Sequence, residues 1–215
     1  MQNLNSRFKK FNGDFIPDII AYLKDYIEKD PTATISVGTD SIQRRRRTVY
    51  AVTIMLYNTD IRNGAHVVFF RESCPKIRDT NDRLDREAML AYEVVEELQK
   101  GLEPFYERKD LSDENRKSYK YSLAKCMGEY SHVAAHDEYR VINSMTLTEE
   151  EKTREYKLID LHLDFNPSAG LSGRNKSNAA YKRHTPWLRG CGYRVMCKNI
   201  AFAATTAADC LLQNT

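Results

Sequence analysis

Length, composition and charge indicate an ordinary globular chain and exclude a membrane-spanning one. The chain has 215 residues, a net charge of +3 and a pI near 8.5. Its 41% hydrophobic and 29% charged residues suit one α/β domain with an insertion, or two small domains. Such mild basicity does not by itself indicate nucleic acid binding, and no apolar run approaches the roughly 20 residues of a membrane helix. Scattered, odd-numbered cysteines and a polar N-terminal stretch predict reduced thiols and a cytoplasmic location.

The first hundred residues predict a helix, three strands and a second helix. Apolar residues recur at helical spacing over residues 14–29. Three strand-like segments joined by short turns follow, and we expect them to pair as an antiparallel meander: 34–41, 48–57 and 65–71. A long amphipathic helix is then expected over residues 80–101, stopped by Gly101 and Pro104.

The second half predicts an insertion followed by two more strands. Residues 104–157 are charged and rich in tyrosine, and we interpret them as a helical insertion within a single domain of residues 1–215. A compact strand over 157–165, a basic helix ending near Pro186, a short strand at 193–197 and an alanine-rich closing helix at 199–213 complete the order. Strands separated by helices should lie parallel to one another.

An aspartate stands where a strand should be apolar. In the strand over residues 35–41, Gly38 and Asp40 share one face, and the apolar residues share the other. A half-buried carboxylate is costly unless a positive or hydrogen-bonding group compensates it. Gly38 should leave open space beside this carboxylate, which suggests a bound cation.

A second acidic strand end follows at residues 157–165. Asp160, His162 and Asp164 share one face of a strand that should be central and apolar on both faces. Asp164 lies at the carboxyl end of this strand, where ligands bind in open α/β sheets. The alternative is an edge strand with a solvated face.

Helical phase selects one glutamate from the long helix. At about 100° per residue, Glu87 falls about 50° from the centre of the apolar stripe and should point at the sheet. Glu93, Glu96 and Glu97 point away and read as ordinary solvated acids. Glu87 is either a metal ligand or one half of an internal salt bridge to an arginine, and Asp209 in the closing helix is either a ligand or a surface acid.

Carboxylates from different elements are what a two-metal site requires. Two divalent cations roughly 3.5–4 Å apart can activate a water and stabilise the leaving oxygen in phosphoryl transfer, and Mg²⁺ prefers hard oxygen ligands. Asp40, Glu87 and Asp164 come from a first strand, a first crossover helix and a fourth strand. Mg²⁺ or Mn²⁺ is therefore the expected cofactor.

Five short segments stand in order along the chain. They are Val37-Gly38-Thr39-Asp40-Ser41, Arg83-Leu84-Asp85-Arg86-Glu87, Leu161-His162-Leu163-Asp164, Gly190-Cys191-Gly192-Tyr193 and Ala203-Ala204-Thr205-Thr206-Ala207-Ala208-Asp209. Their joint order and spacing resemble the ribonuclease H-like superfamily, and within it the bacterial YkuK family. The resemblance implies an α/β fold with a mixed five-stranded sheet, three antiparallel strands then two parallel, flanked by helices.

The resemblance also implies a two-metal site built from Asp40, Glu87 and Asp164. In many nucleases of this superfamily the last acid stands in the first turn of the closing helix. Here that turn reads Lys198-Asn199-Ile200 without an acid, and Asp209 follows more than two turns later. His162 or Asn199 is expected to substitute in part as a ligand.

Two basic segments predict contacts with a DNA or RNA backbone. The run Arg44, Arg45, Arg46 and Arg47 lies in the hairpin after Asp40, where it is either a solvated turn or a phosphate anchor. A second cluster with aromatic residues available for stacking comprises Arg174, Lys176, Lys182, Arg183, His184, Arg189, Tyr181 and Trp187.

Three functional hypotheses follow. The first is a Mg²⁺- or Mn²⁺-dependent nuclease that acts through Asp40, Glu87, Asp164 and Asp209. The second is a catalytically silent ribonuclease H-like module that binds nucleic acid or a protein. The third is a nucleotide-binding phosphotransferase, against which the lack of a glycine-rich phosphate loop counts.

Overall fold

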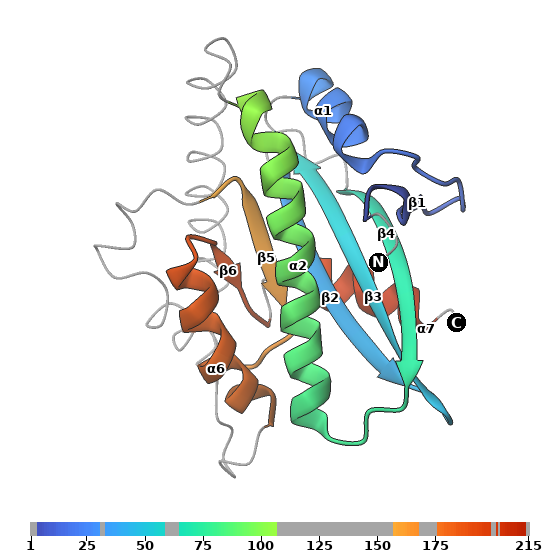
Figure 1. The fold of residues 1–215 in the computed structure, drawn as a ribbon, viewed down its shortest axis with the longest axis vertical. Helices are drawn as coiled ribbons and strands as arrows, with labels where there is room; N and C mark the ends of the chain where they lie inside the picture. The colour runs from blue at the N-terminus through green and yellow to red at the C-terminus, as the bar shows by residue number, and fades with distance from the viewer. Residues whose placement is uncertain are drawn as a thin grey trace, which may run out of the picture.

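A six-stranded mixed sheet forms the centre of the computed structural model, which describes residues 4–30, 33–58, 65–106, 157–167, 176–198, 201 and 203–213 (Figure 1). The strand order is β1-β4-β3-β2-β5-β6. The strands are β1 (Lys9–Lys10), β2 (Ala33–Gln43), β3 (Arg47–Asn58), β4 (Ala65–Pro75), β5 (Ile159–Leu163) and β6 (Val195–Met196). The first four pair antiparallel, and β5 and β6 run parallel to β2.

The predicted mixed α/β sheet is confirmed, with one strand more than the five expected. The additional strand is β1, which pairs with the outer edge of β4 through only two residues. A two-residue strand is too short to give a periodic signal in the sequence. The three meander strands are each longer at their ends than predicted.

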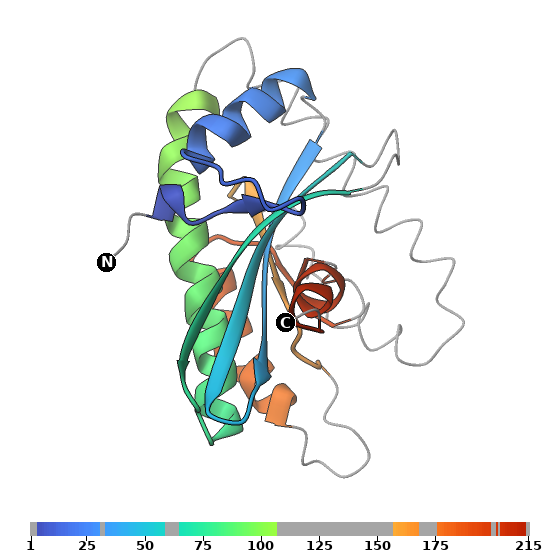
Figure 2. The same cartoon turned by 90° about the vertical axis from the view of Figure 1, so that its right-hand side faces the viewer.

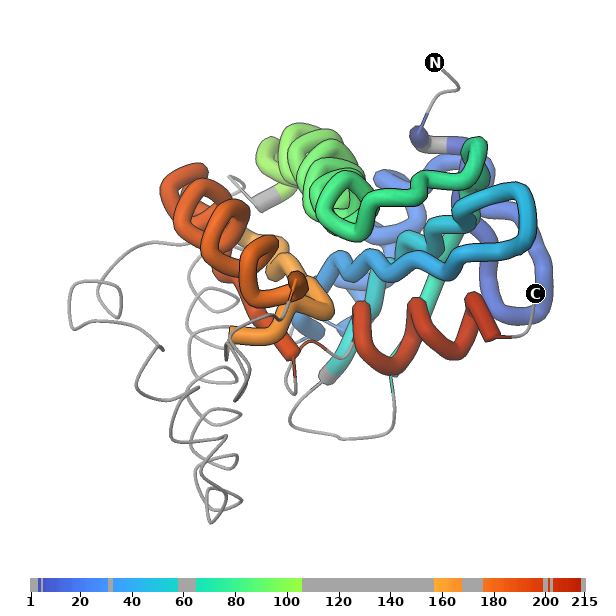
Figure 3. The backbone as a smooth tube through the Cα atoms, turned by 90° about the horizontal axis from the view of Figure 1, so that it is seen from below, coloured from blue at the N-terminus to red at the C-terminus, as the bar shows by residue number. Residues whose placement is uncertain are grey.

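Helices cover both faces of the sheet, and the two faces differ. A short 3₁₀ turn, η1 (Leu4–Ser6), opens the described chain. On one face lie α1 (Ile19–Lys29), α2 (Thr80–Tyr106) and α6 (Lys176–Gly190), as Figure 2 shows with the sheet viewed nearly edge-on. The opposite face carries a π-helical segment, η2 (Ala203–Ala208), continued by α7 (Asp209–Gln213), so that the sheet lies between two layers (Figure 3).

The alternation of β2 and β5 explains how the two layers attach. Parallel partners point to the same face, so Ile35 and Val37 lie beside Ile159 and Leu161, and these side chains are buried under α2. Asp40 is on the opposite face, under η2 and α7. The acidic face of these strands is therefore the face that the C-terminal segment covers.

The space beside Gly38 is filled, and the prediction that it is open is wrong. A Cβ atom built on Gly38 would lie closer than 3.0 Å to the backbone of Ala203 and Ala204. The same junction is tied by Thr53, whose Oγ1 donates a hydrogen bond of 2.6 Å to the carbonyl of Ala203. Gly38 therefore admits the start of η2 against the sheet rather than a cation.

The predicted helix ends are also wrong. Helix α2 continues past Gly101 and Pro104 to Tyr106, because Leu102 and Phe105 extend its buried stripe. Gly101 serves close packing instead, since a Cβ there would lie 2.6 Å from the Ile20 side chain. Helix α6 likewise runs past Pro186 to Gly190, and the closing helix is partly π-helical.

The insertion predicted at 104–157 falls almost wholly outside the described residues. Among the helices that the structure describes, none combines the length and the apolar character needed to cross a membrane.

Replacing Gly38 by alanine should lower the free energy of unfolding by about 1–3 kcal/mol, because the new methyl group meets backbone that cannot turn aside. Urea denaturation followed by circular dichroism measures the change. Gly190→Ala is the matched control, since a Cβ at Gly190 meets nothing within 4 Å. Equal stability of Gly38→Ala and the parent protein would contradict the proposed contact.

Candidate functional site

Asp40 and Asp164 stand side by side at the carboxyl end of the β2–β5 pair. The last paired residues of the two strands are Thr39 and Leu163, so the next residue of each strand is an aspartate. Strand β2 continues in register with β3, where Asp40 faces Ala51. Strand β5 ends, and the chain leaves the sheet at Asp164. The sequence prediction that these two residues lie together is supported by this register.

Asp40 carries a carboxylate that its surroundings disfavour. Burial raises the pKa of Asp40 to about 6, and the negative charges of Asp164 and Asp209 act in the same direction. The backbone N–H of Ser41 donates a hydrogen bond of 2.7 Å to Asp40 Oδ1, and the charge of Arg83 also opposes the rise. These favourable contacts are too weak to offset burial.

Asp164 has the less satisfied carboxylate of the two. Burial raises its pKa, with Lys198 opposing the rise and Asp209 adding to it. Within the described part of the chain, its Oδ1 atom is buried and accepts no hydrogen bond. An unpartnered carboxylate oxygen is costly, so this atom marks the point of the site where a cation or a donor would be most favourable.

Asp209 contributes charge from the C-terminal segment. It is the first residue of α7, and its Oδ2 accepts a hydrogen bond of 2.7 Å from Gln213. Its effect on the pKa of both Asp40 and Asp164 places it near them, although the sequence left open whether it was a surface acid. Asn199, which the sequence suggested as a substitute ligand together with His162, lies outside the described residues.

Glu87 points at the sheet, as its helical phase predicted, but it has its own partners. Its side chain is almost wholly buried. Ser41 Oγ donates a hydrogen bond of 2.5 Å to Glu87 Oε1, and Arg83 Nη1 lies 3.2 Å from the same oxygen. Burial raises the pKa of Glu87 to about 8, with Asp40 adding to the rise. The alternative of an internal salt bridge to an arginine is therefore present in the structure.

Arg83 and Ser41 are the site residues that sequence reasoning missed. Arg83 donates from Nη1 to the carbonyl and to the hydroxyl of Ser41, at 3.0 and 2.6 Å, as well as approaching Glu87. The available signal was the i,i+4 spacing of Arg83 and Glu87 on one helix. Glu96 was misjudged as solvated: its Oε1 accepts hydrogen bonds from Tyr193 and Lys157.

The two polar residues of β5 have different environments. Asp160 forms a buried ion pair with Arg194, with 2.7 Å between Oδ1 and Nε. His162 Nδ1 accepts a hydrogen bond of 3.1 Å from the backbone N–H of Ala203, and burial lowers the pKa of His162 to about 3. A neutral imidazole that accepts at Nδ1 carries its proton on Nε2, so His162 would have to give up this arrangement to bind a metal.

The aspartates lie close enough for their charges to raise the pKa of their neighbours, but they do not form a ready-made coordination shell. Among the described residues, no group of three or more His, Cys, Asp or Glu side chains is arranged to hold a metal ion. Asp40, Asp164 and Asp209 nevertheless supply hard carboxylate oxygens, which is the chemistry that Mg²⁺ and Mn²⁺ prefer. The unpartnered Oδ1 of Asp164 fits such an ion.

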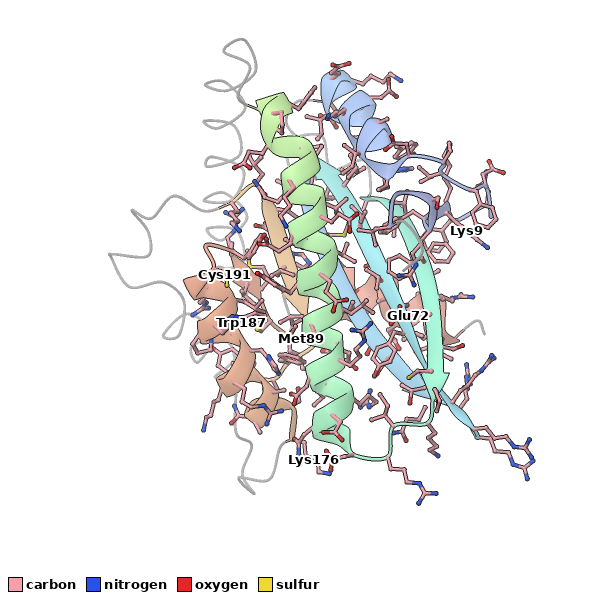
Figure 4. The ribbon with its side chains drawn as sticks, viewed as in Figure 1. Lys9, Glu72, Met89, Lys176, Trp187 and Cys191 are labelled. Atoms are coloured by element: carbon pink, nitrogen blue, oxygen red, sulfur yellow. The ribbon has the colours of Figure 1, made fainter. Side chains whose placement is uncertain are left out.

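The predicted basic residues divide into engaged and exposed ones. Arg44 donates from Nη2 to the carbonyl of Leu212, at 2.9 Å, and so holds the end of α7. Arg45, Arg46 and Arg47 are exposed in the hairpin. Lys176 is exposed at the start of α6, at the lower end of the molecule in Figure 4, and Arg174 lies outside the described residues.

In the second basic cluster, two residues are tied to helix α2. Arg183 forms an ion pair with Asp85, and His184 Nε2 lies 2.7 Å from the same carboxylate. Trp187 lies beside α2, where its ring centroid is 4.7 Å from that of Tyr92 (Figure 4). These contacts join α6 to α2 and account for much of the cluster without a ligand.

The mixed six-stranded sheet with helices on both faces is consistent with the ribonuclease H-like fold that the sequence resembles. A family model described as Ribonuclease H-like matches residues 18–212. The chain therefore belongs to the ribonuclease H-like family. No curated protein and no solved structure matches the chain, and the narrower resemblance to the YkuK family stays a prediction.

Replacing Asp40 by asparagine should stabilise the metal-free protein at pH 7.5 but not at pH 4.5. A raised pKa means that the folded state binds the proton more tightly than the unfolded state, so the stability falls as the pH rises between about 4 and about 6. Asparagine removes this loss and keeps an oxygen for the Ser41 N–H. The expected gain at pH 7.5 is about 1–3 kcal/mol.

Urea denaturation in EDTA at the two pH values measures this gain. The matched control is Glu97→Gln on the exposed side of α2, for which we expect a change within about 0.5 kcal/mol at both pH values. A destabilised Asp40→Asn protein at pH 7.5 would show that the carboxylate is compensated in the folded state.

Proposed function

We propose that the chain is a divalent-metal-dependent nuclease that hydrolyses phosphodiester bonds of DNA or RNA by a two-metal mechanism. The observation that supports this most strongly is the meeting of Asp40, Asp164 and Asp209 at the end of β5, where a buried oxygen of Asp164 has no partner among the described residues. Perturbed acids gathered at the carboxyl end of strands are typical of functional sites.

The residues divide between two ions in this proposal. Asp40, Asp164 and Asp209 would hold the first Mg²⁺ or Mn²⁺, and Glu87 with Asp40 would hold the second. When bound, such ions supply an activated water and neutralise the charge on the leaving oxygen. The hydrogen bond from the Ser41 N–H fixes the orientation of the Asp40 carboxylate.

The hairpin after β2 supports the same proposal through charge. Arg45, Arg46 and Arg47 are exposed and follow Asp40 along the chain by only a few residues. Guanidinium groups in this place would contact phosphates on either side of the bond to be cut, in a manner that weakens with added salt. They position the nucleic acid and carry no base preference.

A catalytically silent module is the second candidate, and one observation favours it. Glu87 already has Ser41 and Arg83 as partners, so its charge is partly neutralised without a metal. A protein of this kind would bind nucleic acid or a protein partner through the same face and would cut nothing.

The purified protein should cut labelled single-stranded DNA, RNA or an RNA–DNA hybrid in Mn²⁺ and not in EDTA. Asp40→Asn and Asp164→Asn should each lower the cleavage rate by about 10²-fold or more, since metal-held charge is worth several kcal/mol at the transition state. Gel electrophoresis of the products measures the rate, and Glu97→Gln should cut like the parent protein. Absence of cleavage with every substrate, in protein that binds them, would support the silent module.

Glu87→Gln separates the two-ion arrangement from a one-ion arrangement. Under the two-ion proposal the substitution should lower cleavage as strongly as Asp40→Asn does, and the Mn²⁺ concentration needed for half-maximal activity should rise. Cleavage within about threefold of the parent protein would instead assign Glu87 to holding Ser41 and Arg83. Mn²⁺ titration of the cleavage rate provides the measurement.

A further inference from the structure

Two phenylalanines project into solvent from the free edge of the sheet. Phe15 is 66% exposed and Phe11 57% exposed, which makes them the most exposed large hydrophobic residues in the described part of the chain. Phe11 lies against Phe69 of β4, with 5.7 Å between the ring centroids. Exposed rings that are grouped in this way commonly mark a binding surface.

The hairpin that carries the two rings is fixed to the core. The N–H of Ile16 donates to the carbonyl of Phe8 at 2.9 Å, and both side chains are buried. Between them a tight turn closes through a 2.9 Å hydrogen bond from Lys10 N to Asp14 O, with Gly13 at a φ of 93°. Because the buried side chains of Phe8 and Ile16 anchor the hairpin, and side chains alternate between the two faces of a strand, the rings of Phe11 and Phe15 point outward.

Cations lie directly over the aromatic rings. Lys9 Nζ is 4.2 Å from the centroid of the Phe15 ring, and the Arg71 guanidinium carbon is 5.5 Å from that of Phe69. Figure 4 places Lys9 at the outer edge of the sheet. Asp14 is the acid of the hairpin itself, and it is held by Asn12 within the turn.

The acid nearest along β4 is directed elsewhere. Glu72 follows Arg71 and therefore points to the α2 face, where it pairs with Arg7 and Arg86. Glu72 therefore adds no negative charge to the surroundings of Phe69 and Arg71 at this edge of the sheet. We call Lys9, Phe11, Phe15, Phe69 and Arg71 the edge platform.

We propose that the edge platform binds single-stranded nucleic acid by stacking unpaired bases on Phe11 and Phe15, with Lys9 and Arg71 contacting the phosphates. Aromatic rings that alternate with cations are the recurrent means by which proteins bind single strands without reading their sequence. A protein partner fits less well, because lysine is depleted in the cores of protein interfaces.

The register of the sheet relates the edge platform to the acidic site. Asp40 faces Ala51, and Ala51 faces Arg71, so these three residues lie on one rung and on one face. Strands lie about 4.8 Å apart, so Arg71 is about 10 Å from Asp40 along the rung. Arg71 also donates to the carbonyl of Leu211, at the end of α7. A single strand held at the platform would pass over α7 toward the acids. The choice of unpaired nucleic acid as the ligand rests on the proposed nuclease function.

Binding of a labelled 12-nucleotide single strand in EDTA tests the edge platform without any cleavage. Fluorescence anisotropy should show a Kd for Phe11→Ala/Phe15→Ala that is about 10–100-fold weaker than that of the parent protein. Phe11→Tyr/Phe15→Tyr keeps the rings and should bind like the parent protein. Met89→Ala is the matched control, since Met89 is an exposed hydrophobic residue on α2. Unchanged binding by the double alanine variant would overturn the inference.

Two further measurements distinguish the edge platform from the acidic site and from a dimer interface. Hydrolysis of bis(4-nitrophenyl) phosphate, which is too small to reach the platform, should be equal in the double alanine variant and the parent protein. If no substrate is cut but the variant still binds the single strand more weakly, the nuclease proposal fails and the platform stands. If light scattering shows that the variant changes only from dimer to monomer, with unchanged binding of the single strand, the surface is a protein interface and the inference is overturned.

Discussion

The arrangement of acidic side chains depends on one backbone contact, between Gly38 of β2 and the start of η2. Because no side chain stands at Gly38, the backbone of Ala203 and Ala204 lies directly on the strand. Thr53 and His162 hold the same junction by hydrogen bonds to the carbonyl and the N–H of Ala203. Helix α7 follows η2 without a break, so this contact is what brings Asp209 to the face that carries Asp40 and Asp164.

The result is a fold that holds like charges close together, which lowers its stability. Burial and neighbouring negative charges raise the pKa of Asp40 and of Asp164, while the charge of Arg83 opposes the rise at Asp40 and that of Lys198 opposes it at Asp164. A protein selected for stability alone would replace such acids by neutral residues. Their joint presence is easier to explain if a ligand of positive charge offsets the cost, because binding to the folded state alone adds to its stability.

Strand and helix periodicity were sufficient to predict the orientation of Asp40, Asp164 and Glu87, but not that of Glu96. The period of two assigned Asp40 and Asp164 each to the polar face of its strand, helical phase placed Glu87 against the sheet, and the structure shows that the two strands are neighbours. The partners of these acids were not predictable in the same way. Whether Gly38 faces a void or a backbone depends on a segment far along the chain. Local rules likewise predicted that α2 ends at Gly101, whereas the packing of Gly101 on Ile20 and the burial of Phe105 extend the helix. Tertiary contacts decided each of these cases.

The sheet divides the candidate site into two parts that differ in charge. On the face of η2 and α7, Asp40, Asp164 and Asp209 have little compensation. From the face of α2, Glu87 enters with Arg83 and Ser41 already bound to it. A divalent cation would therefore be drawn first to the aspartates, where the buried Oδ1 of Asp164 has no hydrogen-bond partner among the described residues. Recruitment of Glu87 would require Arg83 to move or the glutamate to exchange partners, so Arg83 is the residue that sets how readily a second ion could join the first.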